Sequence, residues 1–184
     1  VYHGKHPFTK YPVTQGHEVS GEIVKTGKAV TEFHEGQKVT IEPQVYCSHC
    51  YPCRHGKYNL CEELKVMGFQ TTGTASEYFS VDASKVTLLP EEMSYEEGAM
   101  IEPLAVAVHA VKQMSDVKGM NIAVIGAGPI GNLVAQTAKG MGAARVMITD
   151  VSDFRLDKAK ECGIDVCVNT KKKDFGEAMI EAFG

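Results

Sequence analysis

The order of hydrophobic and polar residues divides the chain into two parts with different patterns. The first part contains short β-branched runs interrupted by glycine and proline, namely HEVSGEIVKTG at 17–27, QKVTIEP at 37–43 and KVTLLP at 85–90. Short runs of this kind between turn residues are typical of antiparallel strands. The pattern therefore predicts a mostly β first part.

From Ser94 the spacing becomes helical. The run SYEEGAMIEPLAVAVHAVKQM, residues 94–114, opens with the Ser-x-x-Glu signature of a helix start. We expect a break in this helix near Pro103, because proline interrupts a helix interior. A polar, glycine-containing link follows at 115–121.

The remainder of the chain alternates between strand-like and helix-like runs. Apolar runs at 122–125, 145–149 and 166–168 read as strands, and runs to about Met141 and at 171–183 read as helices. Such alternation predicts a parallel sheet. We therefore expect two domains, residues 1–115 and residues 116–184.

Composition narrows the classes of function. The chain has 184 residues, of which 43% are hydrophobic, and its formal net charge is -4. It has no basic excess to neutralise nucleic acid or an anionic membrane, so we expect neither partner. It contains no apolar run of about 18 residues, and its first residues lack the apolar core of a signal peptide. We expect a cytoplasmic protein, although a targeting segment that precedes Val1 would go unseen.

Four cysteines in the segment PQVYCSHCYPCRHGKYNLC, residues 43–61, form the first chemical motif. Their C-x2-C-x2-C-x7-C spacing suits tetrahedral zinc in a closed, structural site. Disulfides are less favoured because closely spaced cysteines in tight turns bridge poorly. An iron–sulfur cluster is less favoured because no second cysteine run follows. We interpret His49 and His55 as solvated, and the expected zinc ligands are Cys47, Cys50, Cys53 and Cys61.

A glycine-rich loop directly after the strand at 122–125 is the second motif. Gly126 permits a tight turn, Gly128 lets the backbone approach a pyrophosphate, and Gly131 lets the following helix pack closely on the strand. Asp150, at the end of the second strand, would accept hydrogen bonds from ribose hydroxyls and favour NAD over NADP. The alternative for Asp150 is a turn or capping residue. The candidate cofactor-binding residues are Gly126, Gly128, Pro129, Ile130, Gly131, Asp150 and Arg155.

Three further residues have side chains that suit a catalytic zinc. His17 and Glu18 are adjacent, and Glu102 lies in the predicted helix. Imidazole and carboxylate ligands that leave one position free are typical of catalytic zinc sites. Taken singly, each also fits a structural pair or a solvated helix residue.

Together these motifs resemble the zinc-dependent medium-chain alcohol dehydrogenases, and within them the sorbitol (polyol) dehydrogenase branch. The resemblance runs through YPVTQGHEVSGEIVKTGKAV, the thiol loop, EEGAMIEPLAVAVHA and NIAVIGAGPIG. It implies an α/β fold with a GroES-like, mostly β catalytic domain followed by a truncated Rossmann doubly wound parallel sheet. It also implies that His17 and Glu18 bind a catalytic zinc, with Glu102 a ligand directly or through water. In the ordinary alcohol dehydrogenase branch the Glu102 position resembles cysteine instead.

The resemblance implies hydride transfer from a polyol or secondary alcohol to NAD, by a homo-oligomer that is a dimer or tetramer. Sugar alcohols, sugar phosphates and short diols all remain open as substrates. By analogy, Tyr2 and the segment YHGKHPF, residues 2–8, border the substrate pocket. The family's first zinc ligand, a cysteine, would precede Val1, and only about three strands of the cofactor domain are present. We therefore expect part of a protein about twice as long.

Other readings of the same motifs remain open. A truncated, non-catalytic zinc-binding homologue is the main alternative, because pieces of the expected enzyme are missing from this chain. Threonine dehydrogenase and formaldehyde dehydrogenase have similar loops. A zinc-free crystallin-like or quinone-reductase relative is hard to reconcile with four clustered cysteines.

Overall fold

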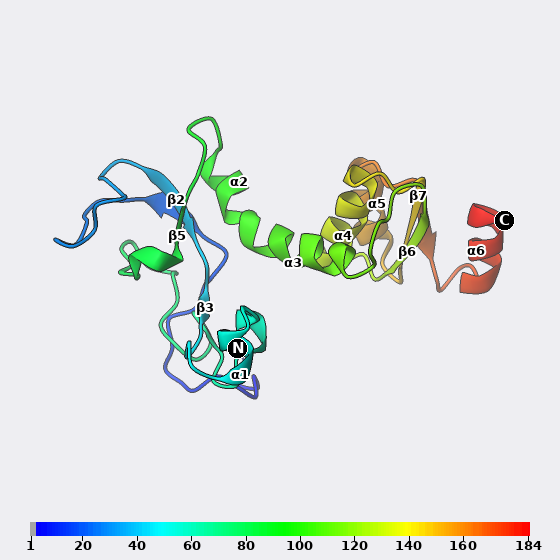
Figure 1. Cartoon of the computed structure of the whole chain (residues 1–184). Coiled ribbons are helices and arrows are strands. Elements are labelled where there is room, and N and C mark those ends of the chain that lie inside the picture. Colours follow the sequence, from blue (N-terminus) through cyan, green and yellow to red (C-terminus); the bar gives the residue numbers. More distant parts are fainter. Residues whose placement is uncertain (1–2) are drawn as a thin grey trace. The chain divides into compact units, whose positions relative to one another are not determined.

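The computed structural model describes residues 3–184, so Tyr2 lies outside the described residues. The chain forms two compact units, Val1–Glu102 and Pro103–Gly184 (Figure 1). The first contains short antiparallel strands and the second contains the parallel sheet. The predicted fold class is confirmed.

The first unit is built on a three-stranded antiparallel sheet. Strands β1 (Ser20–Glu22), β2 (Lys38–Ile41) and β5 (Val86–Leu88) pair in the order β1-β2-β5. A 3₁₀ turn, η2 (Ala83–Lys85), leads into β5 and is capped by the side chain of Asp82. The antiparallel strands expected from the β-branched runs are confirmed.

A second, two-stranded antiparallel sheet joins the two ends of the thiol loop. Strands β3 (Gln44–Val45) and β4 (Lys65–Val66) lie immediately before and after the loop. The loop itself contains two short helical segments, α1 (Tyr51–Arg54) and η1 (Tyr58–Leu60), where the sequence predicted turns alone. Proline in the first turn of α1 explains this helix, because its fixed φ suits a helix start.

Two helices follow the first sheet. Helix α2 (Tyr95–Ala99) begins with a capping box between Ser94 and Glu97, as the Ser-x-x-Glu signature predicted. Helix α3 (Ile101–Lys112) then starts after Met100, so the break lies before Pro103. Proline is tolerated in the first turn of α3 because the N–H groups there have no intrahelical partner.

The second unit is a parallel sheet with helical crossovers. Strands β6 (Asn121–Ile125), β7 (Arg145–Asp150) and β8 (Val166–Asn169) pair in the order β6-β7-β8. Ile122 lies opposite Val146, and Thr149 opposite Val168. The crossovers and the last helix are α4 (Pro129–Gly140), α5 (Asp153–Glu161) and α6 (Phe175–Phe183).

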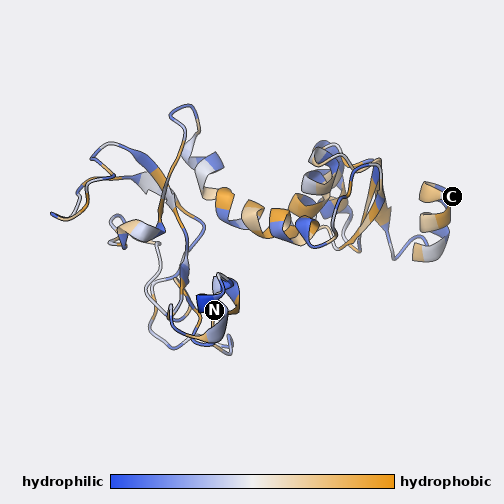
Figure 2. Ribbon diagram, in the orientation of Figure 1, coloured by the Kyte–Doolittle hydropathy of each residue, from blue (hydrophilic) through white to orange (hydrophobic). Residues whose placement is uncertain are grey.

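Strand β7 carries the core of this unit on both of its faces. Val146 and Ile148 are buried together with Ala135 of α4 and Leu156 of α5. Met147, which alternates with them, is buried on the other face against residues of α6, Ala178 and Ala182. The strands of this sheet are accordingly strongly hydrophobic (Figure 2), as expected for a parallel sheet covered on both sides.

The two compact units divide within α3, earlier than the domain boundary expected between residues 115 and 116. The physical reason is that Val111 of α3 is buried in the same core as Val117 and Ile122, so this helix packs with the parallel sheet. Within residues 3–184, no helix has the length and apolar character needed to cross a membrane.

Candidate functional site

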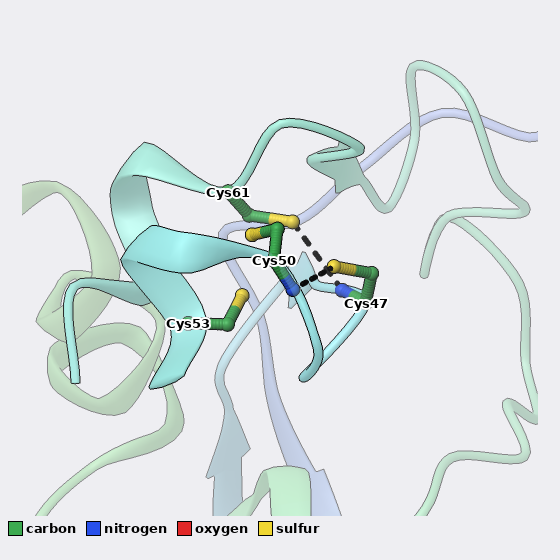
Figure 3. Close-up of side chains that lie close together, drawn as sticks. All are labelled: Cys47, Cys50, Cys53 and Cys61. Atoms are coloured by element: carbon green, nitrogen blue, oxygen red, sulfur yellow. Dashed lines mark hydrogen bonds between the residues drawn. The ribbon is translucent and has the colours of Figure 1, made fainter. Parts of the chain in front are cut away.

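The four cysteines of the thiol loop converge on one point. Their side chains point toward one another (Figure 3), and their sulfur atoms all lie within 4.8 Å of one another. Cys50 is the N-cap of α1 and Cys53 lies within that helix, so one short helix sets two of the four positions. All four are free thiols, and three of them are buried.

Backbone N–H groups point at these sulfur atoms. Cys50 N donates to Cys47 Sγ at 3.4 Å, and Cys47 N donates to Cys61 Sγ at 3.3 Å. The N–H of Glu63 also donates to Cys61 Sγ, at 3.3 Å. Such donors orient the sulfurs and stabilise thiolates, as around metal-bound cysteines.

The thiols differ in how readily they ionise. The backbone N–H of Glu62 lowers the pKa of Cys50 to about 6, whereas burial raises the pKa of Cys53 to about 12. Of these two thiols, Cys50 is therefore the one that ionises more readily and can attract a cation, and a bound cation displaces the protons of the other thiols. Four clustered sulfur donors with N–H partners fit a closed, tetrahedral zinc site.

His17, Glu18 and Glu102 form a second group. One ligand atom from each lies within 4.8 Å of the others, although Glu102 is far from His17 and Glu18 in the sequence. His17 and Glu18 are separated from the start of β1 by Val19, and Glu102 lies in the first turn of α3. Two carboxylates and an imidazole at this separation fit a divalent cation with an open coordination position.

Burial dominates the electrostatics of Glu102. Burial raises the pKa of Glu102. The His17 side chain lowers this pKa, and the Glu18 carboxylate raises it further. Two carboxylates so close together repel each other when both are ionised, and a bound cation would remove that repulsion.

A loop from Met67 to Ala75 braces the backbone that carries His17. Thr74 N donates to Gly16 O at 2.9 Å, and Ala75 N donates to Gln15 O at 2.8 Å. A Cβ built on Gly73 would lie 2.5 Å from the carbonyl carbon of Gln15, so only glycine permits this approach.

An aromatic residue of the same loop contacts the imidazole of His17. The ring of Phe69 lies 5.1 Å from that of His17, and it stacks on His6 at 4.8 Å. The sequence pattern did not predict this role for Phe69. The glycines that flank it at positions 68 and 73 are the one available signal.

The glycine loop leads from β6 into α4 as predicted. Gly126 has a positive φ of 98°, which favours glycine, and its N–H donates to Thr149 O at 2.8 Å. A Cβ on Gly131 would lie 1.9 Å from Gly126 O, so helix α4 packs directly on the loop. By contrast, a Cβ on Gly126 or Gly128 would meet no other atom of residues 3–184 within 4 Å.

The start of α4 therefore has the features of a phosphate cradle. Gly128 is the N-cap, Pro129 opens the first turn, and Ile130 follows with its side chain partly exposed. Helix N-termini favour anions because their N–H groups and their dipole point outward. The open side of the loop and this helix start together fit a pyrophosphate.

Asp150 is tied to the glycine loop. Its Oδ2 accepts a hydrogen bond from Ala127 N at 2.9 Å, and its Oδ1 accepts from Val151 N and Ser152 N at 2.8 and 2.9 Å. Arg155 Nη1 lies 3.5 Å from Oδ2. The Ala127 N–H, followed by those of Ser152 and Val151, lowers the pKa of Asp150. Asp150 is only 8% exposed, and its side chain makes the hydrogen bonds expected of a turn or capping residue. Ribose binding by Asp150 stays a prediction.

Comparison with known proteins places these features in a family. The profile described as "Alcohol dehydrogenase GroES-like domain" matches residues 1–91. The profile described as "Zinc-binding dehydrogenase" matches residues 129–184. The first profile includes the antiparallel strands and the thiol loop, and the second runs from the start of α4 through β7 and β8 to the end of the chain.

Curated relatives are similar over most of the chain. A probable D-xylulose reductase A from Aspergillus fumigatus is 44% identical over 156 residues, which cover 83% of this chain and 43% of that protein. The sorbitol dehydrogenase of Bacillus subtilis is 36% identical over 169 residues, which cover 91% of this chain and 48% of that protein. The chain thus spans about half the length of the curated relatives it matches.

Solved structures share the fold. An alcohol dehydrogenase from Escherichia coli CFT073 in complex with NADH has a TM-score of 0.88 and 37% identity, with 98% of this chain and 53% of that chain covered. A Sinorhizobium meliloti 1021 protein in complex with NADP has a TM-score of 0.90 and 32% identity, with 95% and 51% covered. Profiles, relatives and structures agree, and the chain belongs to the zinc-dependent medium-chain alcohol dehydrogenase family.

Proposed function

We propose that this chain is part of an NAD-dependent zinc enzyme that oxidises a polyol or secondary alcohol. The observation that carries the proposal is the convergence of His17, Glu18 and Glu102 on one point. The names of the sorbitol dehydrogenase and D-xylulose reductase relatives support a polyol substrate. The same family membership supports a cytoplasmic homo-oligomer.

The residues of the second group have distinct roles in this proposal. His17 would offer an imidazole nitrogen and Glu18 a carboxylate oxygen to the zinc, and Glu102 would offer a carboxylate oxygen directly or through water. When bound, zinc supplies a Lewis acid that acidifies the alcohol, and NAD supplies the hydride acceptor. Phe69 and the loop at 67–75 hold His17 in place. His17, Glu18 and Glu102 are therefore metal-binding residues, and Phe69 is a positioning residue.

The glycine loop and Asp150 would bind the cofactor. The N–H groups at the start of α4 would face the pyrophosphate, with Gly126, Gly128 and Gly131 providing the close approach, and Pro129 and Ile130 forming the first turn. An ionised Asp150 would repel a 2′-phosphate, which favours NAD. Arg155 beside it partly offsets this repulsion. Cys47, Cys50, Cys53 and Cys61 would hold a structural zinc.

Zinc content and NADH formation test the proposal on the intact gene product that contains this chain. Native mass spectrometry should find two zinc ions per subunit, and a panel of polyols and secondary alcohols should include one that yields NADH. The variant Glu102→Gln should lose turnover, while His109→Gln, an exposed change on the same helix, should not. One zinc per subunit and no NADH with any substrate would instead indicate a non-catalytic zinc-binding homologue.

A further inference from the structure

A second group of metal-binding side chains adjoins the thiolate cluster. Cys47, His49 and Glu63 each offer one ligand atom, and these atoms lie within 4.8 Å of one another. Cys47 belongs to both groups. The pattern is visible in the sequence, since His49 and Glu63 each follow a clustered cysteine by two residues.

Hydrogen bonds hold His49 in the orientation of a metal ligand. Its Nδ1 lies 2.8 Å from Cys47 O. A carbonyl oxygen can only accept, so Nδ1 carries a proton, and Nε2 is the ring nitrogen that is left to bind a metal. Metal-binding histidines commonly donate their other N–H to a backbone carbonyl in this way.

Glu63 contacts His49 directly. Its carboxylate Oε1 lies 3.3 Å from His49 Nε2, and its own N–H donates to Cys61 Sγ. The residue that offers the carboxylate is thus fixed by a sulfur of the buried cluster. Ser48 has a positive φ of 64°, an uncommon conformation for a residue other than glycine, within the turn between Cys47 and His49.

The two groups differ sharply in exposure. The side chains of His49 and Glu63 are 73% and 64% exposed. Cys50, Cys53 and Cys61 are 8%, 4% and 7% exposed. The exposed group and the buried cluster share Cys47, so a cation held by His49 and Glu63 at the surface lies beside the buried sulfurs.

We propose that Cys47, His49 and Glu63 form a transit site through which zinc enters and leaves the four-cysteine site. The proposal rests on the assignment of the four cysteines as zinc ligands under the proposed function. In transit the ion is held by Cys47 Sγ, His49 Nε2, the Glu63 carboxylate and solvent.

Loading is a ligand exchange without any redox change. Bonds from the ion to Nε2 and to the carboxylate break as bonds to the sulfurs of Cys50, Cys53 and Cys61 form. Each sulfur that is a thiol when the ion reaches it, Cys47 first, releases its proton to solvent, and the bond to Cys47 persists through the exchange. Release of zinc is the reverse, and the sulfurs that lost a proton take one up again from solvent.

Zinc exchange kinetics test this route on the zinc-loaded protein. Transfer of bound zinc to a chromogenic chelator would be followed in His49→Gln and Glu63→Gln, in a His17→Ala background that removes the second zinc. The control is His55→Gln, because His55 lies in the same loop with its Nδ1 at 2.8 Å from Tyr51 O but outside the group. Both test variants should slow transfer by about tenfold while the zinc content at equilibrium is unchanged, and the control should match the parent.

Three outcomes contradict the reasoning in different ways. Unchanged transfer rates in both test variants would overturn the transit site and leave His49 and Glu63 as a surface ion pair. Loss of zinc at equilibrium in His49→Gln would also overturn it, since His49 would then be a permanent ligand. Retention of that zinc in Cys50→Ser would refute the thiolate assignment itself, independently of the transit site.

Discussion

Gly131 provides a direct test of how the glycine loop and helix α4 fit together. The change Gly131→Ala adds one methyl group, whose carbon would lie 1.9 Å from Gly126 O, where real contacts are not shorter than 3.0 Å. The obstacle is a backbone carbonyl and cannot rotate away. Either the loop or the helix start must therefore move by about 1 Å, at the place proposed to bind the pyrophosphate.

The expected cost follows from two opposing effects. Overpacking of a tightly packed site costs about 1–3 kcal/mol. Alanine recovers at most about 1 kcal/mol over glycine in a helix. Because an overlap at 1.9 Å is severe, we take the upper end of the overpacking cost, so the net loss is about 2 kcal/mol. This corresponds to a fall in Tm of roughly 8–16 °C for a unit of this size.

The matched control is Gly140→Ala, in the same helix. A Cβ there would meet no other atom of the described chain within 4 Å, and the φ of Gly140 is not positive. This variant should be as stable as the parent or slightly more stable. Thermal unfolding by circular dichroism and NADH binding by fluorescence would be measured on both variants. If Gly131→Ala matches Gly140→Ala in Tm and in NADH affinity, the close packing inferred at the loop is wrong.

Three further predictions follow from the site. Because the pKa of Asp150 is lowered in the folded chain, its contribution to stability is full above the unfolded-state pKa of about 3.9 and is lost as the pH falls through the folded-state pKa. Asp150→Asn should therefore lose stability at pH 7 and show a smaller further loss on acidification, and parallel Tm profiles from pH 7 to pH 3 would contradict this. Gly73→Ala should lower the unfolding free energy by about 2 kcal/mol and weaken zinc retention, because its Cβ would lie 2.5 Å from the backbone of Gln15. The control Gly27→Ala, whose Cβ would make one ordinary contact at 3.8 Å, should change neither quantity. Urea unfolding and a chelator assay measure the two effects. In a His17→Ala background, which lacks the second zinc, chelation of zinc should lower the melting temperature, but not after Cys53→Ala is added, because that variant should already lack the structural zinc by mass spectrometry.

The glycine loop was predictable because its rules are local. A strand, three glycines at fixed spacing, a helix and an acidic residue at the next strand end all lie within one short segment. The thiol loop was predictable for the same reason, since the spacing of the cysteines and the turn residues between them set the geometry.

The contacts that were not predicted join distant parts of the chain. His17 and Glu102 could be brought together only through a family resemblance, because no local pattern places β1 beside the start of α3. Phe69 contacts His17 through a loop that backbone hydrogen bonds fold against Gln15 and Gly16. His49 is exposed, as expected, but its contact with Glu63 was not predicted because Glu63 lies beyond the last cysteine of the motif. The helix break was expected near Pro103 but lies at Met100. A proline is tolerated in the first turn of a helix, and α3 begins at Ile101, so Pro103 does not interrupt it.

The hydrogen bond from Ala127 N to Asp150 Oδ2 has a consequence for the thermodynamics of cofactor binding. It joins the loop to the end of β7 in the free chain, so the entropy cost of ordering the loop is met during folding and does not weaken association. Under the proposed function, cofactor affinity and the folding of the parallel sheet would then depend on the same carboxylate. A substitution that weakens this hydrogen bond would then lower both the stability of the sheet and the affinity for the cofactor, because the loop is already ordered before a dinucleotide binds.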